Sequence, residues 1–326
     1  MTRREAISLL AAAAWPRGGW AAELGAAATR HTIGERFTLG CLFRVIIDED
    51  SAPARQAAGD ALVIAERIND ACSPLMAEAQ VQSFCRKPHG KAHEVGPVFF
   101  EGLELTRHLA EVTDGRFDPT RGPLTALWAT ARRRAKLPSA EALAKAREAV
   151  GWQHLVLDAD KRTAMLENDG MRLDFGDVAR GFAADKMLAK LAADGFPRAI
   201  VRAGGEIRVG DPPRGATTWR LGVPVSEPGG DKVIVVPLAK AGISTAGGMS
   251  QALRIGGTRY ASLLDPASGL GLTRFIAATV IADNATAAAA LAVAACVAGP
   301  EATQDAFAAW GARAVRMVCE LSLIHI

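Results

Sequence analysis

The chain has 326 residues, of which 49% are hydrophobic and 22% are charged. This length and apolar content allow one large domain or two smaller ones, each with a core. Basic and acidic residues nearly balance at a net charge of +3, which excludes an electrostatic case for nucleic-acid binding.

The N-terminus has the order of an export signal. Arg3 and Arg4 precede an apolar run over residues 6–15, and small residues follow around position 21. Adjacent arginines favour the twin-arginine route over an ordinary Sec signal, and the run is too short to span a bilayer. We therefore expect residues 1–30 to be a twin-arginine-type signal peptide and leader, and the mature protein to be periplasmic or in the cell envelope.

Hydrophobic periodicity predicts strands and helices along the rest of the chain. The expected strands lie at residues 34–48, 152–157, 199–202, 219–225, 232–237, 251–255 and 274–282. The expected helices lie at residues 53–72, 96–113, from Ser139 onward, 178–194 and from Asn284 to Gly299, with Ser139 and Asn284 as N-caps. The elements do not alternate as βαβ units, so the fold class is α+β, a largely antiparallel sheet core with flanking helices.

A single domain is expected over residues 31–320. Residues 321–326 resemble a translated sequencing adapter, so they are interpreted as a non-native tail. The Ala-rich stretch 282–298 is interrupted by Asp283 and Asn284 and predicts a buried helix, which leaves no membrane span after signal removal. The five cysteines have neither C-x-x-C spacing nor an even count, and they are interpreted as mostly buried thiols.

Three glycine-centred segments are candidates for chemistry, at residues 113–123, 173–185 and 202–207. In the second segment, a glycine turn before a helix would expose backbone amides to an anion, and Arg180 could neutralise a phosphate. The carboxylates of Asp174 and Asp177 could bind a metal or hydrogen-bond to a ring. A surface loop and an ordinary capped helix are the alternatives for the first two segments. Neither G-x-G-x-x-G nor a P-loop is present.

Taken in order, these segments and two later ones resemble the FAD:protein FMN transferase (ApbE) family over about residues 34–318. The matching parts are Asp114 to Leu124 with Leu127-Trp128, Leu173 to Gly176 with Arg180 to Asp185, Ala203 to Ile207, Ile243 to Thr245 with Gly247, and Arg259-Tyr260 with Leu264 to Gly269. The resemblance implies an ApbE-like, T-fold-like architecture.

The resemblance also implies an activity. Members of the family bind FAD as substrate, split its diphosphate with Mg²⁺, release AMP and attach FMN to a Thr or Ser of an exported flavoprotein. The acceptor supplies the nucleophile, which agrees with the absence of a Ser-His pair from the sequence. By the same resemblance, FAD-contacting positions are Leu39, Arg116, Phe117, Asp118, Asp174, Arg180 and Leu264.

Several family positions are changed in this chain. The helix Asp and Thr that bind Mg²⁺ in the family correspond to Ala289 and Val293, and neither can ligate a hard cation. Asp177 stands where the family donates a backbone carbonyl to the metal. It is predicted to replace part of the lost metal site, or else to cap the following helix. The leading hypothesis is therefore FMN transfer, and the alternatives are a non-catalytic FAD-binding homologue and an FAD diphosphatase.

Overall fold

The computed structural model describes residues 31–227, 230–248, 252–302, 304–319 and 322–325. The proposed signal segment 1–30, the start of the strand expected at 251 and parts of the tail at 320–321 and 326 lie outside the described residues. Within the described part, no helix is both long and apolar enough to cross a membrane.

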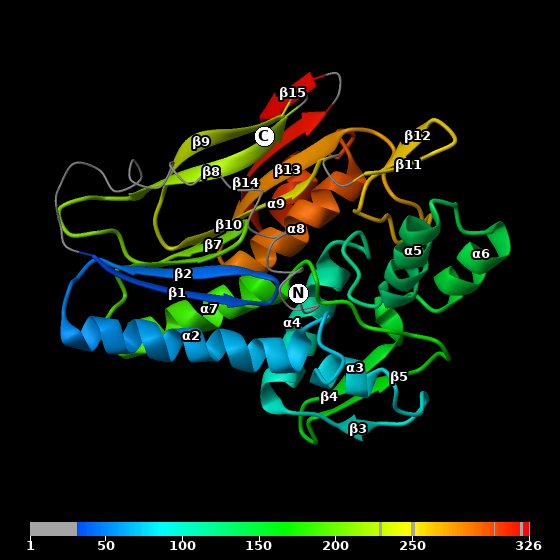
Figure 1. The fold of residues 1–326 in the computed structure, drawn as a ribbon, viewed down its shortest axis with the longest axis horizontal. Coiled ribbons are helices and arrows are strands. Elements are labelled where there is room, and N and C mark those ends of the chain that lie inside the picture. Colours follow the sequence, from blue (N-terminus) through cyan, green and yellow to red (C-terminus); the bar gives the residue numbers. More distant parts are fainter. Residues whose placement is uncertain (1–30, 228–229, 249–251, 303, 320–321, 326) are drawn as a thin grey trace, which may run out of the picture.

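An antiparallel sheet forms the centre of the molecule (Figure 1). Among the described residues it has eight strands, in the order β1 (Thr32–Thr38), β2 (Cys41–Ile47), β6 (Ala199–Ala203), β7 (Glu206–Val209), β10 (Ala241–Gly247), β13 (Ile276–Ala282), β14 (Ala312–Cys319) and β15 (Ser322–His325). Side chains alternate along β2, so Val45 and Ile47 face one core while Ile46 faces another.

Helices cover one face of this sheet and a hairpin covers the other (Figure 1). The covering hairpin is β8 (Trp219–Glu227) and β9 (Gly230–Leu238), and its apolar residues form a core with Ile46 and Ile200. The helices packed in the main core are α2 (Ala52–Cys72), α4 (Pro97–Val112), α7 (Ala179–Ala193) and α8 (Ala285–Ala298). The α+β prediction with a largely antiparallel sheet is confirmed.

Smaller elements surround the ends of these helices. They are α3 (Gln80–Phe84), α5 (Gly122–Arg134), α6 (Ala140–Glu148), α9 (Gln304–Ala309), the 3₁₀ turn η3 (Trp152–His154), a sheet of β3 (His93–Glu94), β5 (Thr163–Leu166) and β4 (Leu155–Asp158), and the pair β11 (Leu253–Ile255) and β12 (Thr258–Tyr260). The strand expected at 152–157 is therefore wrong at its start, where η3 stands.

The single strand expected over residues 34–48 is wrong, because the chain turns back at Leu39 and Gly40. Thr38 pairs with Cys41, and both turn residues have positive φ, 48° at Leu39 and 74° at Gly40. That geometry matches a two-residue hairpin turn, which usually carries Asn-Gly or Asp-Gly. The Leu-Gly turn lacks this signal, and an alternating pattern with β-branched residues continues across it.

Both predicted N-caps are confirmed. The Ser139 side chain accepts a hydrogen bond from the Ala142 amide, and Asn284 accepts one from the Ala287 amide. The cap alternative for Asp177 is wrong. Helix α7 begins at Ala179 with Val178 at its N-cap, and no side chain caps it.

Candidate functional site

Two of the glycine-centred segments lie side by side at the start of α7. The Asp174 amide donates to the Pro119 carbonyl at 2.7 Å, and the Gly122 amide donates to the Arg172 carbonyl at 3.1 Å. A Cβ added at Gly122 would stand 2.6 Å from that same carbonyl oxygen, so glycine permits this close approach. The contacts hold the start of α5 against the turn that carries Asp174 and Asp177.

The Arg121 guanidinium lies between two carboxylates at this junction. Its Nη2 atom is 2.5 Å from Asp177 Oδ2, and its Nε atom is 3.5 Å from Asp174 Oδ2. The side chains of Arg121 and Asp174 are 9% and 8% exposed, whereas Asp177 is 29% exposed. Arg121 is therefore a buried cation, and one of its carboxylate partners faces partly outward.

Electrostatics hold this group in its charged form. Burial by itself disfavours the charged guanidinium, but the Asp177 and Asp174 carboxylates outweigh it and raise the pKa of Arg121. Burial opposes the ionised form of Asp174 as well. The Arg121 charge, the Thr125 hydroxyl at 2.7 Å and the Gly176 amide at 2.8 Å together hold the pKa of Asp174 below its ordinary value.

The third glycine segment reaches the same helix end through Arg180. Its guanidinium donates to Glu206 through Nε at 2.7 Å and Nη2 at 2.8 Å, a bidentate pair that fixes its plane. Glu206 opens β7 directly after the Gly204–Gly205 turn. Cys41 lies beside this pair, and burial raises the pKa of its thiol to about 12. The structure thus brings together Asp174, Asp177 and Arg180, which the sequence predicted as site residues.

The other predicted FAD contacts have partners within the protein. The Asp118 carboxylate accepts from the Thr120 amide and hydroxyl at 2.7 and 2.6 Å and from the Trp152 amide at 3.1 Å. Phe117 is 1% exposed in the main core. Arg116 lies over the Trp310 ring with its Cζ atom 5.6 Å from the centroid. Asp118 and Phe117 therefore stabilise the loop in this structure, while their contact with FAD stays a prediction.

Leu39 and Leu264 are both buried, in different clusters. Leu39 is 8% exposed at the tip of the β1–β2 hairpin and belongs to the main core. Leu264 is 4% exposed in a small cluster with Leu124 and Trp128. The Trp128 Nε1 atom donates to the Gly269 carbonyl at 2.8 Å, which joins the first resemblance segment to the last.

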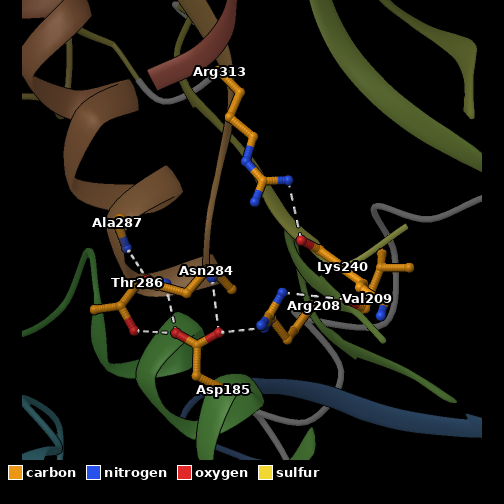
Figure 2. Close-up of polar contacts among 9 residues, drawn as sticks. Asp185, Arg208, Val209, Lys240, Asn284, Thr286, Ala287 and Arg313 are labelled. Atoms are coloured by element: carbon orange, nitrogen blue, oxygen red, sulfur yellow. Dashed lines mark hydrogen bonds and ion pairs between the residues drawn. The ribbon is translucent and has the colours of Figure 1, made fainter. Parts of the chain in front are cut away.

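Helix α8 is anchored to α7 by a carboxylate (Figure 2). Asp185 accepts from the Ala285 amide through Oδ1 at 2.8 Å and from the Thr286 amide through Oδ2 at 2.9 Å, and Arg208 Nε lies 3.1 Å from Oδ1. Burial raises the pKa of Asp185, although these hydrogen bonds oppose the rise. Asn284 caps the same helix end, so α8 is fixed in register against α7.

The two family positions that are changed in α8 carry no oxygen ligand. Ala289 and Val293 are 2% and 4% exposed and pack in the main core. Burial raises the pKa of Cys296, further along the helix, to about 12.

This donor set does not fit Mg²⁺. A magnesium ion needs oxygen ligands in near-octahedral geometry, usually from one or two carboxylates together with phosphates and water. Asp177 is the carboxylate at the expected position, and the Arg121 guanidinium already pairs with it. Among the described residues no group of three or more His, Cys, Asp or Glu side chains could hold a metal ion.

Sequence reasoning missed Arg121 and Glu206 as members of this cluster. Arg121 stands inside a segment that was recognised as a whole, but its partners Asp174 and Asp177 follow far along the chain. A weak signal was present. Arg121 lies directly before the helix that begins at Gly122-Pro123, and the next apolar residue of that helix, Leu124, is fully buried.

The chain belongs to the ApbE family, whose sequence profile matches residues 39–315. It is 31% identical over 214 residues to the FAD:protein FMN transferase of Treponema pallidum (strain Nichols), covering 61% of this chain and 59% of that protein. With the FAD:protein FMN transferase of Klebsiella pneumoniae (strain 342) it shares 26% identity over 287 residues, 85% of this chain and 81% of that one. The chain therefore spans less than two thirds of the T. pallidum relative.

Solved structures share the fold. The ApbE protein of Thermotoga maritima superposes with a TM-score of 0.80 at 27% identity, covering 91% of this chain and 97% of that one. The apo form of Pseudomonas stutzeri flavinyl transferase ApbE gives a TM-score of 0.77 at 27% identity, covering 91% and 94% of the two chains. These comparisons confirm the predicted family and fold.

Proposed function

We propose that this protein binds FAD and transfers its FMN half to a Thr or Ser hydroxyl of an acceptor protein. The acceptor oxygen bonds to the phosphorus of the FMN half, the bond from that phosphorus to the bridging oxygen breaks, and AMP leaves with that oxygen. The hydroxyl proton passes to solvent. The observation that carries the proposal is the shared fold and family, which covers nearly the whole described chain.

Residues at the start of α7 would serve the diphosphate of FAD. The bidentate contact with Glu206 uses two N–H groups of Arg180 and leaves the others free of that carboxylate. A guanidinium held in one plane orients phosphate oxygens at a small entropic cost, because its rotamer is already fixed. Arg180 would therefore position the diphosphate, while Glu206 positions Arg180.

No step is assigned to Mg²⁺, since the donor set does not fit it. Phosphoryl transfer depends chiefly on positioning and on stabilising charge on the phosphate oxygens, which guanidinium groups also provide. Ala289 and Val293 favour a second candidate function, a non-catalytic FAD-binding protein. A third, FAD hydrolysis to AMP and FMN, differs from transfer only in its acceptor.

One incubation separates these three functions. The purified protein is mixed with FAD, with and without a peptide containing a Ser/Thr-Gly-Ala-Thr segment, and AMP and peptide-bound flavin are measured by chromatography and fluorescence. Transfer gives AMP and labelled peptide together. A diphosphatase gives AMP and free FMN without peptide. Quenched flavin fluorescence with no AMP identifies a binding protein, and the absence of any quenching refutes all three.

Export of the protein is part of the proposal. The Arg3-Arg4 pair and the apolar run that follows support a twin-arginine-type signal, and an exported acceptor protein would then meet the enzyme in the periplasm or cell envelope. N-terminal sequencing of periplasmic material should begin near residue 22. An intact Met1 on cytoplasmic protein would contradict export and leave the flavin chemistry untouched.

A further inference from the structure

We propose that the Arg121 guanidinium is the resident cation of this site and replaces a divalent metal, so that FAD binding here is independent of Mg²⁺. The inference rests on the proposed function, because FAD is the ligand whose binding is described. It concerns a residue that neither sequence pattern nor family resemblance had assigned.

Arg121 is held where it is by several independent contacts. Its Nη2 atom lies 2.5 Å from Asp177 and its Nε atom 3.5 Å from Asp174, and the next residue, Gly122, is hydrogen-bonded to the Arg172 carbonyl. The Nε atom is buried without a hydrogen-bond partner, so its charge is balanced mainly through the ion pairs. These contacts keep the buried Arg121 guanidinium in the site.

A metal would have to displace this cation. Asp177 cannot bind Mg²⁺ through the oxygen that faces Arg121 unless the guanidinium withdraws, and withdrawal would leave a buried charge with one partner fewer. Breaking one side of a buried ion pair is strongly unfavourable for that reason. The arrangement therefore selects against a divalent ion at Asp177.

The two α8 positions that the resemblance assigns to the metal supply no replacement ligand. The side chains of Ala289 and Val293 are buried and present only carbon. A hard cation takes oxygen ligands, and the carboxylate of Asp177 is already paired with Arg121.

Charge balance leads to the same conclusion. The carboxylates of Asp174 and Asp177 surround Arg121, and Glu206 is matched by Arg180. With these pairs formed, most of the negative charge that would attract a divalent cation is already neutralised. Positive charge beside the diphosphate then comes from side chains, and Arg121 acts as a positioning residue that keeps Asp177 from repelling the phosphates.

Two measurements on the unmodified protein test the inference. FAD titrations followed by flavin fluorescence are run in EDTA and in excess Mg²⁺, and we expect dissociation constants that agree within about twofold, a difference well below that of one hydrogen bond. Mn²⁺ binding is followed by electron paramagnetic resonance of free Mn²⁺, and we expect no tight site.

Variants test the role of Arg121. We expect Arg121→Met to weaken FAD binding in EDTA by at least about tenfold, because the unpaired Asp177 carboxylate then repels the phosphates, and to gain Mn²⁺ binding through the freed Asp177. Arg121→Lys should keep much of the affinity because it keeps the charge. Arg121→Met with Asp177→Asn removes both charges and should lose the Mn²⁺ signal again.

The matched control is Arg36→Met. Arg36 pairs with Glu66 at 2.8 Å on the surface between β1 and α2, so this variant also loses a guanidinium from an ion pair but should change neither FAD nor Mn²⁺ binding. Tight Mn²⁺ binding to the unmodified protein that Asp177→Asn abolishes, with FAD affinity rising in Mg²⁺, would overturn the inference and leave the proposed function standing. FAD binding in neither buffer would instead refute the proposed function.

Discussion

A glycine at the crossing of α7 and α8 should be essential for the spacing of the two helices. A Cβ added at Gly181 would stand 2.7 Å from the Ala285 carbonyl oxygen and 2.9 Å from the Thr286 amide nitrogen. Both are backbone atoms of α8, so the helix itself must move. The movement would also strain the hydrogen bonds from these two residues to Asp185.

The chain offers a matched control for Gly181→Ala. Gly59 lies inside α2, and a Cβ added there would meet no atom within 4 Å. Gly59→Ala should therefore stabilise the protein by about 0.5–1 kcal/mol through helix propensity alone. Gly181→Ala gains the same propensity but incurs overpacking of roughly 1–3 kcal/mol and weakened capping bonds. We expect the two free energies of unfolding to differ by about 2–4 kcal/mol, with opposite signs.

Urea denaturation followed by far-ultraviolet circular dichroism measures both variants under the same conditions. The comparison cancels the intrinsic effect of replacing glycine by alanine in a helix. If Gly181→Ala raises the free energy of unfolding as much as Gly59→Ala does, then α7 and α8 are not in contact at this point, and the anchoring of α8 by Asp185 loses its support.

Three further predictions follow from the same contacts. Because the pKa of Asp174 is held below its ordinary value, its ion pair stabilises the protein above about pH 4, and this stability is lost as the pH falls through the folded pKa. In Asp174→Asn the free energy of unfolding, measured by urea titration between pH 5 and pH 3, should therefore fall less steeply with pH than in the unmodified protein. Asn284→Ala removes the cap on the Ala287 amide and should lower the free energy of unfolding by about 1 kcal/mol, which thermal and urea denaturation can detect. Since burial raises the pKa of Cys41 to about 12, iodoacetamide at pH 8 should modify it far more slowly than a free cysteine, and rapid labelling by peptide mass spectrometry would contradict its burial beside Arg180.

Local signals in the sequence were sufficient for most helices. The boundaries of α2 and α4 agree within a residue or two with the expected ranges 53–72 and 96–113. Apolar spacing and a proline in the first helical turn are signals that depend only on residues close together in the sequence. The two caps at Ser139 and Asn284 are equally local. Strands were predicted less well. Strand β10 was not predicted, because Ile243 and Thr245 are its only β-branched residues and stand among Ala, Gly and Ser, which carry little strand signal.

The site was predictable only in part, for a physical reason. Asp174, Asp177 and Arg180 share one turn and the first residues of a helix, so their proximity follows from the chain itself. The ion pair between Asp177 and Arg121 depends on how α5 docks against that turn, through a contact between distant segments. No property of either segment alone specifies it.

Retention of the family's sequence segments also has a structural explanation that does not require catalysis. Asp118 binds the amides of Thr120 and Trp152, and Trp128 holds Gly269, so these residues maintain the scaffold whether or not FAD is cleaved. Residues that differ from the family pattern are therefore the more informative ones for chemistry. One of them is Asp177, the carboxylate that was predicted to bind a metal, and the buried Arg121 guanidinium pairs with it. Whether the protein transfers FMN depends on how well this fixed charge stabilises the phosphate oxygens without a metal.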